Sequence, residues 1–422
     1  MLLLASYRTY RLDDLQAAAR SLDIELTLGT DRCHVLAKAW RDGVLTLDLE
    51  DVASCVAHAS AAHQERGFAA VLGTCESSSE IAAAVAEALG LPGNTLESVR
   101  LARDKSLLRA RLRERSVPTP RAVCLPLDVP FRDLQDVVAR EIGWPVVVKP
   151  LLLSGSRGVM RADDAATLEQ RRARLAGILA APDVRQAGRL ENGQFLVEEF
   201  VQGAEVALEG FLRDGRLEVL ALFDKPDPLD GPFFEETLYI TPSRLKQIVQ
   251  DDIARVVLDA TRAMGLARGP VHAEVRLRQL EGAVQPVVLE VAARSIGGLC
   301  ARTLRFGAGI SLDEVVLRGV LGDPHVTVAR ERSAAGVMMI PIPKAGVLRG
   351  VSGVSEALAL TGIVDVVILA REWEELVPLP EGTSYLGFVF ARSETPEDVE
   401  VALRAAHECL RFTITRKIDV VR

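Results

Sequence analysis

Two apolar stretches in the second half of the chain each carry one carboxylate, and a short polar turn at residues 279–285 joins them. Valine, leucine and alanine surround both Glu274 and Glu290, which is the composition of buried strands. Strands joined by so short a turn pair antiparallel, so the two carboxylates can meet on one face of a sheet. A buried carboxylate is costly unless it is paired or bound to a metal. The pattern predicts either a Mg²⁺ site, because Mg²⁺ prefers oxygen ligands, or ion pairs with arginines such as Arg276 and Arg294.

A lysine beside a glycine-rich turn forms a second feature. Lys149 ends a β-branched run, and the Ser-Gly-Ser-Arg-Gly segment at residues 154–158 follows it. Glycine lets backbone N–H groups approach phosphate oxygens closely, and the lysine would place an ammonium beside them. The Walker A pattern is absent, so this is not a P-loop. A plain hairpin turn is the other interpretation of the segment.

A third apolar run ends in acids. Glu198 and Glu199 close a strand-like segment, and Glu205 follows after a glycine. The backbone at this point could face a purine edge, and a carboxylate could bind ribose hydroxyls. An ordinary edge strand with a solvated end explains the same residues equally well.

The N-terminal part of the chain alternates between strand and helix patterns, which predicts a parallel sheet with crossover helices. No dinucleotide fingerprint follows its strands. The expected strands are residues 2–5, 24–28 and 69–72, and the expected helices are 12–22, 81–89 and the basic segment 98–115. In the last hundred residues we expect strands at 337–340, 366–369 and 387–391 and a helix at about 396–410.

Length and charge exclude several classes of protein. A chain of 422 residues with 49% apolar residues predicts roughly two to four packed units. Fifty basic and 58 acidic residues give a net charge of −8, which argues against nucleic-acid binding. No apolar run reaches the length of about 18 that spans a bilayer, and the apolar opening lacks the basic segment of a secretory signal. The six cysteines include no C-x-x-C pair and indicate neither a disulfide framework nor a zinc cluster. We therefore expect a cytoplasmic protein without a membrane partner.

The order of these features is similar to that of the ATP-grasp superfamily. Over about residues 95–310, the matching features are Lys105, Lys149, 154–158, 198–205, Glu274, Glu290 and Arg294. The segments 346–348, 378–382 and 386–389 resemble the C-terminal domain of the L-amino acid ligases, which make dipeptides. The resemblance implies an α/β (α+β) ATP-grasp fold with a two-lobed ATP-binding region. Its units would be a Rossmann-like domain at 1–94, an ATP-grasp domain at 95–310 with a lid at about 118–203, and an α+β C-terminal domain at 311–422.

The resemblance also implies a nucleotide site. The residues implied to contact ATP phosphates are Lys105 and Lys149, together with the mobile loop of Ser154, Gly155, Ser156 and Gly158. Those implied to contact adenine, chiefly through the backbone, are Glu198, Glu199, Phe200 and Val201, with Glu205 on the ribose. Glu274 and Glu290 would hold Mg²⁺, or Mn²⁺ in its place. Many superfamily members carry an asparagine metal ligand where this chain has Ala292, so one ion must take an extra water or bind less tightly.

The substrate residues are also implied by the resemblance. Arg294 would stabilise an acyl phosphate and the intermediate that follows it. Glu236, with Glu235 as the next candidate, would receive the ammonium of an amino-acid substrate, although solvated acids in a rigid loop fit the same residues. His272 lies on the same strand face as Glu274 and is either a substrate contact or a core histidine. Backbone N–H groups at Gly297 and Gly298 could bind a substrate carboxylate or form a plain turn.

The expected activity is ATP- and Mg²⁺-dependent ligation of a carboxylate, of an amino acid by resemblance, to an amine through an acyl phosphate, with release of ADP and phosphate. The partners would be small-molecule acids and amines, and the apolar content is compatible with a homodimer. Two alternatives remain at this stage. One is a bicarbonate- or formate-using ligase of the purine or biotin-carboxylase type. The other is a regulatory protein that binds ATP without catalysis.

Overall fold

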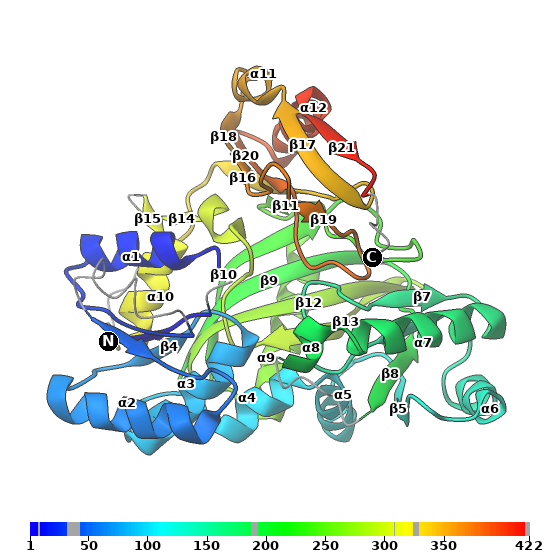
Figure 1. Ribbon diagram of the computed structural model, residues 1–422, viewed down its shortest axis with the longest axis horizontal. Coiled ribbons are helices and arrows are strands. Elements are labelled where there is room, and N and C mark those ends of the chain that lie inside the picture. Colours follow the sequence, from blue (N-terminus) through cyan, green and yellow to red (C-terminus); the bar gives the residue numbers. More distant parts are fainter. Residues whose placement is uncertain (7–8, 32–42, 187–192, 308, 324–328, 418–422) are drawn as a thin grey trace, which may run out of the picture.

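The computed structural model describes residues 1–6, 9–31, 43–186, 193–307, 309–323 and 329–417. Its lobes are arranged around a long antiparallel sheet, which gives an α/β architecture (Figure 1). Cys33, one of the six scattered cysteines, lies outside the described residues. Among the described helices, none is long and apolar enough to cross a membrane.

The N-terminal unit contains the predicted parallel sheet. Its strand order is β3 (Val44–Thr46), β2 (Thr27–Thr30), β1 (Leu2–Leu4) and β4 (Val71–Gly73). Its helices are α1 (Leu12–Ser21), α2 (Val52–Arg66) and α3 (Glu76–Ala88). Helix α3 begins at Glu76 instead of residue 81, because the Ser78 hydroxyl caps the turn by accepting hydrogen bonds from two preceding backbone N–H groups.

The basic segment expected as one helix forms two, α4 (Leu96–Arg103) and α5 (Lys105–Glu114). Asp104 separates them with an extended backbone, and its carboxylate accepts hydrogen bonds from the N–H groups of Ser106 and Leu107. The single-helix prediction was wrong because an aspartate N-cap stabilises a new helix start at this position. Lys105 consequently stands at the N-terminus of α5.

The lid is a small antiparallel sheet with helices on one side. Its strand order is β5 (Ala122–Pro126), β8 (Gln194–Glu199), β6 (Val146–Lys149) and β7 (Met160–Ala162). Its helices are α6 (Phe131–Glu141), α7 (Ala165–Leu179) and α8 (Pro182–Gln186). Leu134, Val146 and Phe195 belong to its own buried core. Strand β8 lies inside this sheet, not at its edge, and residues 154–158 are part of the connection between β6 and β7.

The central sheet has eight strands. Their order is β13 (Ala283–Ala292), β12 (Gly269–Leu280), β9 (Ala204–Arg213), β10 (Arg216–Lys225), β11 (Leu238–Thr241), β16 (Ala334–Ile340), β20 (Gly387–Ser393) and β18 (Ile363–Ile368). The predicted hairpin of β12 and β13 is confirmed, and Glu274 lies directly opposite Glu290. Helix α9 (Gln247–Met264) packs against this sheet. The core that contains Leu3, Phe223 and Phe388 joins the N-terminal unit, the central strands and the C-terminal strands.

The C-terminal part adds a second small sheet beside the end of the central one (Figure 1). Its strand order is β19 (Glu375–Leu376), β17 (Gly346–Ser352) and β21 (Arg411–Thr415). The remaining elements are α10 (Leu312–Val320), α11 (Val354–Leu358), α12 (Pro396–Cys409), the 3₁₀ helix at Cys300–Thr303 and the pair β14 (Arg305–Phe306) and β15 (Ile310–Ser311). The strands and the helix expected in the last hundred residues are confirmed as β16, β18, β20 and α12, apart from small shifts of their ends.

Candidate active site

A large cavity of about 1240 Å³ lies where the lobes meet. The N-terminal unit, the lid, the central sheet and the C-terminal part all contribute to its wall, for example through Thr74, Lys149, Glu274 and Tyr385. Every site residue named from the sequence lines this cavity except Gly158 and Glu235. The sequence motifs, although far apart along the chain, therefore converge on one place.

Two lysines enter the cavity from different lobes. The Lys105 ammonium, at the N-terminus of α5, donates to the Leu153 carbonyl oxygen over 2.8 Å and lies 3.9 Å from a Glu290 oxygen. Lys149 ends β6 and forms an ion pair with Glu198. Burial lowers the pKa of Lys149, although the Glu198 charge opposes this effect. The two ammonium groups and the helix N-terminus make this end of the cavity favourable for phosphate.

Glu198 faces two cations instead of open space. Its carboxylate accepts a hydrogen bond of 2.9 Å from Arg109 Nε and pairs with Lys149, and only 2% of the side chain is exposed. Burial would raise the pKa of Glu198, but the charges of Arg109 and Lys149 outweigh it and lower the pKa. The side chain is therefore fully engaged with these two cations, and the Glu198 backbone lies between β5 and β6 in the lid sheet. Arg109 lies in an arginine-rich helix, so no pattern in the sequence singled it out.

The glycine-rich turn has a left-handed backbone at Gly155, Ser156 and Gly158, with φ values of 63°, 56° and 74°. Its end is tied to the C-terminal part, because the Gly158 N–H donates to the Pro380 carbonyl over 2.9 Å. A Cβ atom at Gly158 would come within 3.0 Å of Leu175. Gly158 thus shapes the turn from behind, while the first residues of the turn line the cavity.

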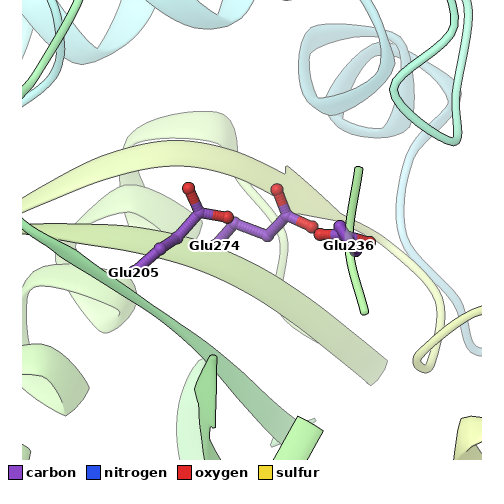
Figure 2. A group of neighbouring side chains, drawn as sticks. All are labelled: Glu205, Glu236 and Glu274. Carbon is purple, nitrogen blue, oxygen red and sulfur yellow. The ribbon is translucent and has the colours of Figure 1, made fainter. Parts of the chain in front are cut away.

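Three carboxylates surround one ammonium at the centre of the cavity wall. Oxygens of Glu205, Glu236 and Glu274 lie within 4.8 Å of one another (Figure 2). The Lys225 ammonium lies 2.7 Å from Glu205, 3.4 Å from Glu274 and in contact with Glu236. Burial is the main reason that the pKa of Glu236 rises to about 7, and the Glu274 and Glu205 charges add to it. The three carboxylates hold Lys225 charged, raising its pKa despite burial.

No sequence pattern singled out Lys225. It ends β10, and Glu205 and Glu236 are respectively 20 and 11 residues away along the chain. Glu205 also accepts a hydrogen bond of 2.9 Å from Arg276 Nε. The one available signal was that a lysine stands at the end of an apolar run, as Lys149 does.

Glu274 and Glu290, the predicted metal ligands, lie on neighbouring strands and both line the cavity. They face each other across β12 and β13, and neither pairs with the arginines that offered the alternative explanation. Arg276 pairs with Glu205, and Arg294 pairs with Glu76. Both carboxylates reach the cavity, with exposed side-chain fractions of 23% and 31%. Two accessible carboxylates beside a phosphate-binding end form a donor set that fits Mg²⁺ or Mn²⁺.

Arg294 is held in place by the N-terminus of α3. Its guanidinium donates to Glu76 in the first turn of that helix, over 3.0 Å from Nε and more closely from Nη2. Burial would raise the pKa of Glu76, but the charge and hydrogen bonds of Arg294 outweigh it and lower the pKa to about 2. Glu76 therefore stays ionised at neutral pH and positions Arg294 at the cavity.

Under the ATP-dependent activity that the sequence resemblance implies, replacing Glu76 with glutamine should reduce turnover without much effect on ATP binding. The amide keeps the shape of the side chain but loses the charge that orients Arg294, so we expect kcat to fall about tenfold to hundredfold. Steady-state kinetics with ATP as the varied substrate would show a lower kcat and a nearly constant KM. Glu65→Gln on the exposed face of α2 is the matched control. Equal kcat values for the Glu76 variant and the unaltered protein would remove Glu76 from this role.

His272 lines the cavity and belongs to a largely buried network within its wall. Its Nδ1 lies 3.1 Å from the fully buried Glu209, which also accepts a hydrogen bond from the backbone N–H of Ile296. Burial would lower the pKa of His272, but contacts with Glu209 and Glu274 raise it to about 9. His272 and Glu274 share a strand face, and His272 Nε2 lies 3.9 Å from a Glu274 oxygen. The network fixes the turn that carries Gly297 and Gly298 against the central sheet.

Aromatic rings form another part of the cavity wall. Phe388 packs against Tyr385 and Tyr10, with ring centroids 6.1 Å and 6.5 Å apart. Gly298 has a φ of 59°, and a Cβ atom there would lie 3.0 Å from the Phe388 ring. These three rings come from the N-terminal and C-terminal parts of the chain, so their meeting could not be inferred from local sequence patterns. The cavity wall therefore has a cationic part and an aromatic part.

Three family models match the chain. The ATP-grasp N-terminal domain matches residues 16–93, the ATP-grasp domain residues 142–303, and the L-amino acid ligase C-terminal domain 2 residues 338–415. Among solved structures, the L-amino acid ligase from Bacillus licheniformis has a TM-score of 0.78 and 25% sequence identity. The alignment covers 98% of this chain and 99% of that one.

Curated relatives with lower coverage include two kinds of ligase. Alanine–anticapsin ligase of Bacillus subtilis (strain 168) is 28% identical over 243 residues, which is 55% of this chain and 49% of that ligase. D-alanine–D-alanine ligase of Cupriavidus pinatubonensis (strain JMP 134 / LMG 1197) is 27% identical over 315 residues, which is 71% of this chain and 88% of that ligase. The chain spans about half the length of the alanine–anticapsin ligases that it matches.

Proposed function

Because the chain belongs to the ATP-grasp superfamily and resembles the L-amino acid ligases, we propose that it uses ATP and Mg²⁺ to join an amino-acid carboxylate to an amine. The observation that carries the proposal is a single cavity with three adjoining parts. Two lysines mark a phosphate-binding part, two facing carboxylates form a metal-binding pair, and aromatic rings form an aromatic part. Such a cavity can hold a nucleotide and a small organic acid side by side.

We assign ATP to the cationic part. Lys105 and Lys149 would contact its phosphates, and the backbone that follows β8, at Phe200 and Val201, would face the adenine. The Glu198 side chain supports this assignment because its own ion pairs prevent it from turning toward the ligand. Mg²⁺ at Glu274 and Glu290 would neutralise charge on the phosphate oxygens. The turn at residues 154–158 would cover the phosphates and exclude water.

The reaction follows from this arrangement of charge. A substrate carboxylate oxygen attacks the γ-phosphorus of ATP, the bond to the bridging oxygen breaks, and ADP leaves with the electron pair. Arg294 would stabilise the acyl phosphate and the anionic intermediate formed when the amine attacks its carbonyl carbon. Phosphate then leaves and an amide remains. Glu76 supports this role for Arg294 because it holds the guanidinium charged and oriented.

Glu236 is the residue that we assign to the ammonium group of an amino-acid substrate. It lines the cavity, whereas Glu235 does not, and its carboxylate already accepts hydrogen bonds from Lys225 and the Tyr239 hydroxyl. The aromatic part formed by Tyr10, Tyr385 and Phe388 would accept an apolar amino-acid side chain. Gly297 and Gly298 would offer backbone N–H groups to the substrate carboxylate.

The experiment that tests this function measures ADP and phosphate release from ATP and Mg²⁺ with pools of amino acids, in buffer free of bicarbonate and with a no-substrate control. We expect ADP release together with a product lighter by one water than two pool members, identified by mass spectrometry. ADP release that requires bicarbonate or formate would contradict the amino-acid assignment. ATP binding without turnover in any pool would favour a regulatory protein.

Replacing Lys149 with alanine should weaken ATP binding about tenfold, because one charge-assisted contact to a phosphate is lost. Isothermal titration calorimetry with a nonhydrolysable ATP analogue measures the dissociation constant directly. Lys246→Ala, at an exposed lysine before α9, should bind like the unaltered protein. Identical affinities for the Lys149 variant and this control would count against the phosphate role.

A further inference from the structure

A second cavity of about 460 Å³ lies at the junction between the lid and the central sheet. Helix α5, the linker at residues 116–121, the lid strands β5 and β8, and the hairpin of β12 and β13 all contribute to its wall. The linker is fixed there, since the Val288 N–H donates to the Pro118 carbonyl over 2.9 Å and the Thr119 hydroxyl donates to the Val288 carbonyl over 3.1 Å. A ligand in this cavity would contact both lobes that enclose the nucleotide.

The charged side chains described in the wall of this second cavity are all positive. Four arginines line it, and none of the aspartates and glutamates that the structure describes does. The arginines are Arg109, Arg113, Arg121 and Arg278. Arg109 and Lys149 both form ion pairs with Glu198, and Arg121 and Arg278 both form ion pairs with Glu199. Two carboxylates thus pair with four cations, and Arg113 pairs with neither of them, so positive charge remains uncompensated.

Two of the arginines have nitrogens that could bind a ligand. Arg109 is 4% exposed, and its Nη1 is buried with no hydrogen-bond partner in the described part of the chain. The exposed Arg113 guanidinium likewise forms no ion pair or hydrogen bond with any described residue. A buried guanidinium nitrogen without a partner is costly, and an anionic ligand would satisfy it.

We propose that this second cavity binds a small multivalent anion, either a polycarboxylate or a phosphorylated metabolite. The volume lies within the range of about 300–1,000 Å³ that is common for small-molecule sites. Guanidinium groups form paired hydrogen bonds with carboxylate and phosphate oxygens, whereas the apolar lining at Val117, Leu196 and Val287 suits a short carbon skeleton. This site is separate from the nucleotide cavity but adjoins it through the ion pair of Arg109 with Glu198.

The test uses the full-length protein in metal-free buffer with a saturating nonhydrolysable ATP analogue, so that the nucleotide cavity is filled. Citrate and pyrophosphate are titrated separately by calorimetry. We expect one site per chain for at least one of them. If only citrate binds, the ligand is a polycarboxylate; if only pyrophosphate binds, the ligand is phosphorylated. If both bind, the site recognises negative charge. Absence of binding by either anion would overturn the proposal.

Variants locate the bound anion. Arg113→Ala should weaken its binding about tenfold through the loss of one charge-assisted hydrogen bond, and Arg113→Lys should lose less. Arg115→Ala is the matched control, because Arg115 is an exposed arginine two residues away that does not line the cavity. It should bind like the unaltered protein, and ATP-dependent turnover should be unchanged in both alanine variants. Equal affinity in Arg113→Ala and the unaltered protein, or equal weakening in Arg115→Ala, would contradict this site.

Discussion

Replacing Glu290 with glutamine is expected to abolish ATP-dependent turnover while leaving the fold intact. Glu290 makes one long ion pair, 3.9 Å from Lys105, and about a third of its side chain is exposed, so the fold does not depend on its charge. In the proposed metal site, the amide removes one of the two negatively charged ligands. Loss of charge stabilisation in phosphoryl transfer should lower kcat by a factor on the order of 10³.

The rate is measured as ADP release, and the fold is checked by the midpoint of thermal unfolding. Glu281→Gln is a close control, because Glu281 is an exposed acid in the turn of the same hairpin and undergoes the same chemical change. It should retain full activity. Undiminished ADP formation by the Glu290 variant would exclude Glu290 from the metal site.

Replacing Lys225 with methionine should produce a large loss of stability. The Lys225 side chain is 3% exposed and lies between Glu205, Glu236 and Glu274, so the methionine variant leaves three carboxylates without their common cation. Removing one partner of a buried ion pair typically costs about 3–5 kcal/mol. Chemical denaturation at neutral pH should therefore show a free energy of unfolding lower by about that amount.

The stability loss in this variant should depend on pH in a defined direction. Burial already raises the pKa of Glu236 to about 7 with Lys225 present, and removal of the lysine raises it further. When the pKa of a carboxyl group is higher in the folded state than in the unfolded state, the group favours folding at pH values below its unfolded-state pKa. This contribution is lost as the pH rises through its folded-state pKa. The deficit should thus shrink between pH 7 and pH 5. Lys344→Met, at an exposed lysine, controls for the loss of charge. A Lys225 variant as stable as this control would contradict the three-carboxylate arrangement.

Local patterns were sufficient to predict the parts of the fold that depend on neighbouring residues. The hairpin that sets Glu274 opposite Glu290 follows from two apolar runs and a short polar turn. The parallel N-terminal sheet follows in the same way from alternating strand and helix patterns. The break at Asp104 was missed because an N-cap inside a basic helical segment has the same local composition as a continuous helix.

Contacts between segments that are far apart in the chain could not be predicted from local sequence patterns. Arg294 and Glu76 are separated by 218 positions, and the pair forms only because α3 begins at the cavity. Lys225 joins acids from three segments, so no single motif contains the cluster. The strands β16, β20 and β18 continue the central sheet past residue 310, where the sequence suggested a domain boundary.

The central claim is that the protein forms an amide through an acyl phosphate. It is tested most directly by following the transfer of one oxygen atom from the substrate carboxylate to phosphate. A pool of amino acids carrying ¹⁸O in both carboxylate oxygens is incubated with the protein, ATP and Mg²⁺ in unlabelled water, and the released phosphate is analysed by mass spectrometry. An acyl phosphate passes one carboxylate oxygen to phosphate, so each amide formed should yield one ¹⁸O-labelled phosphate. Amide formation with unlabelled phosphate would contradict the acyl-phosphate mechanism and the roles of Arg294 and Glu290 in it.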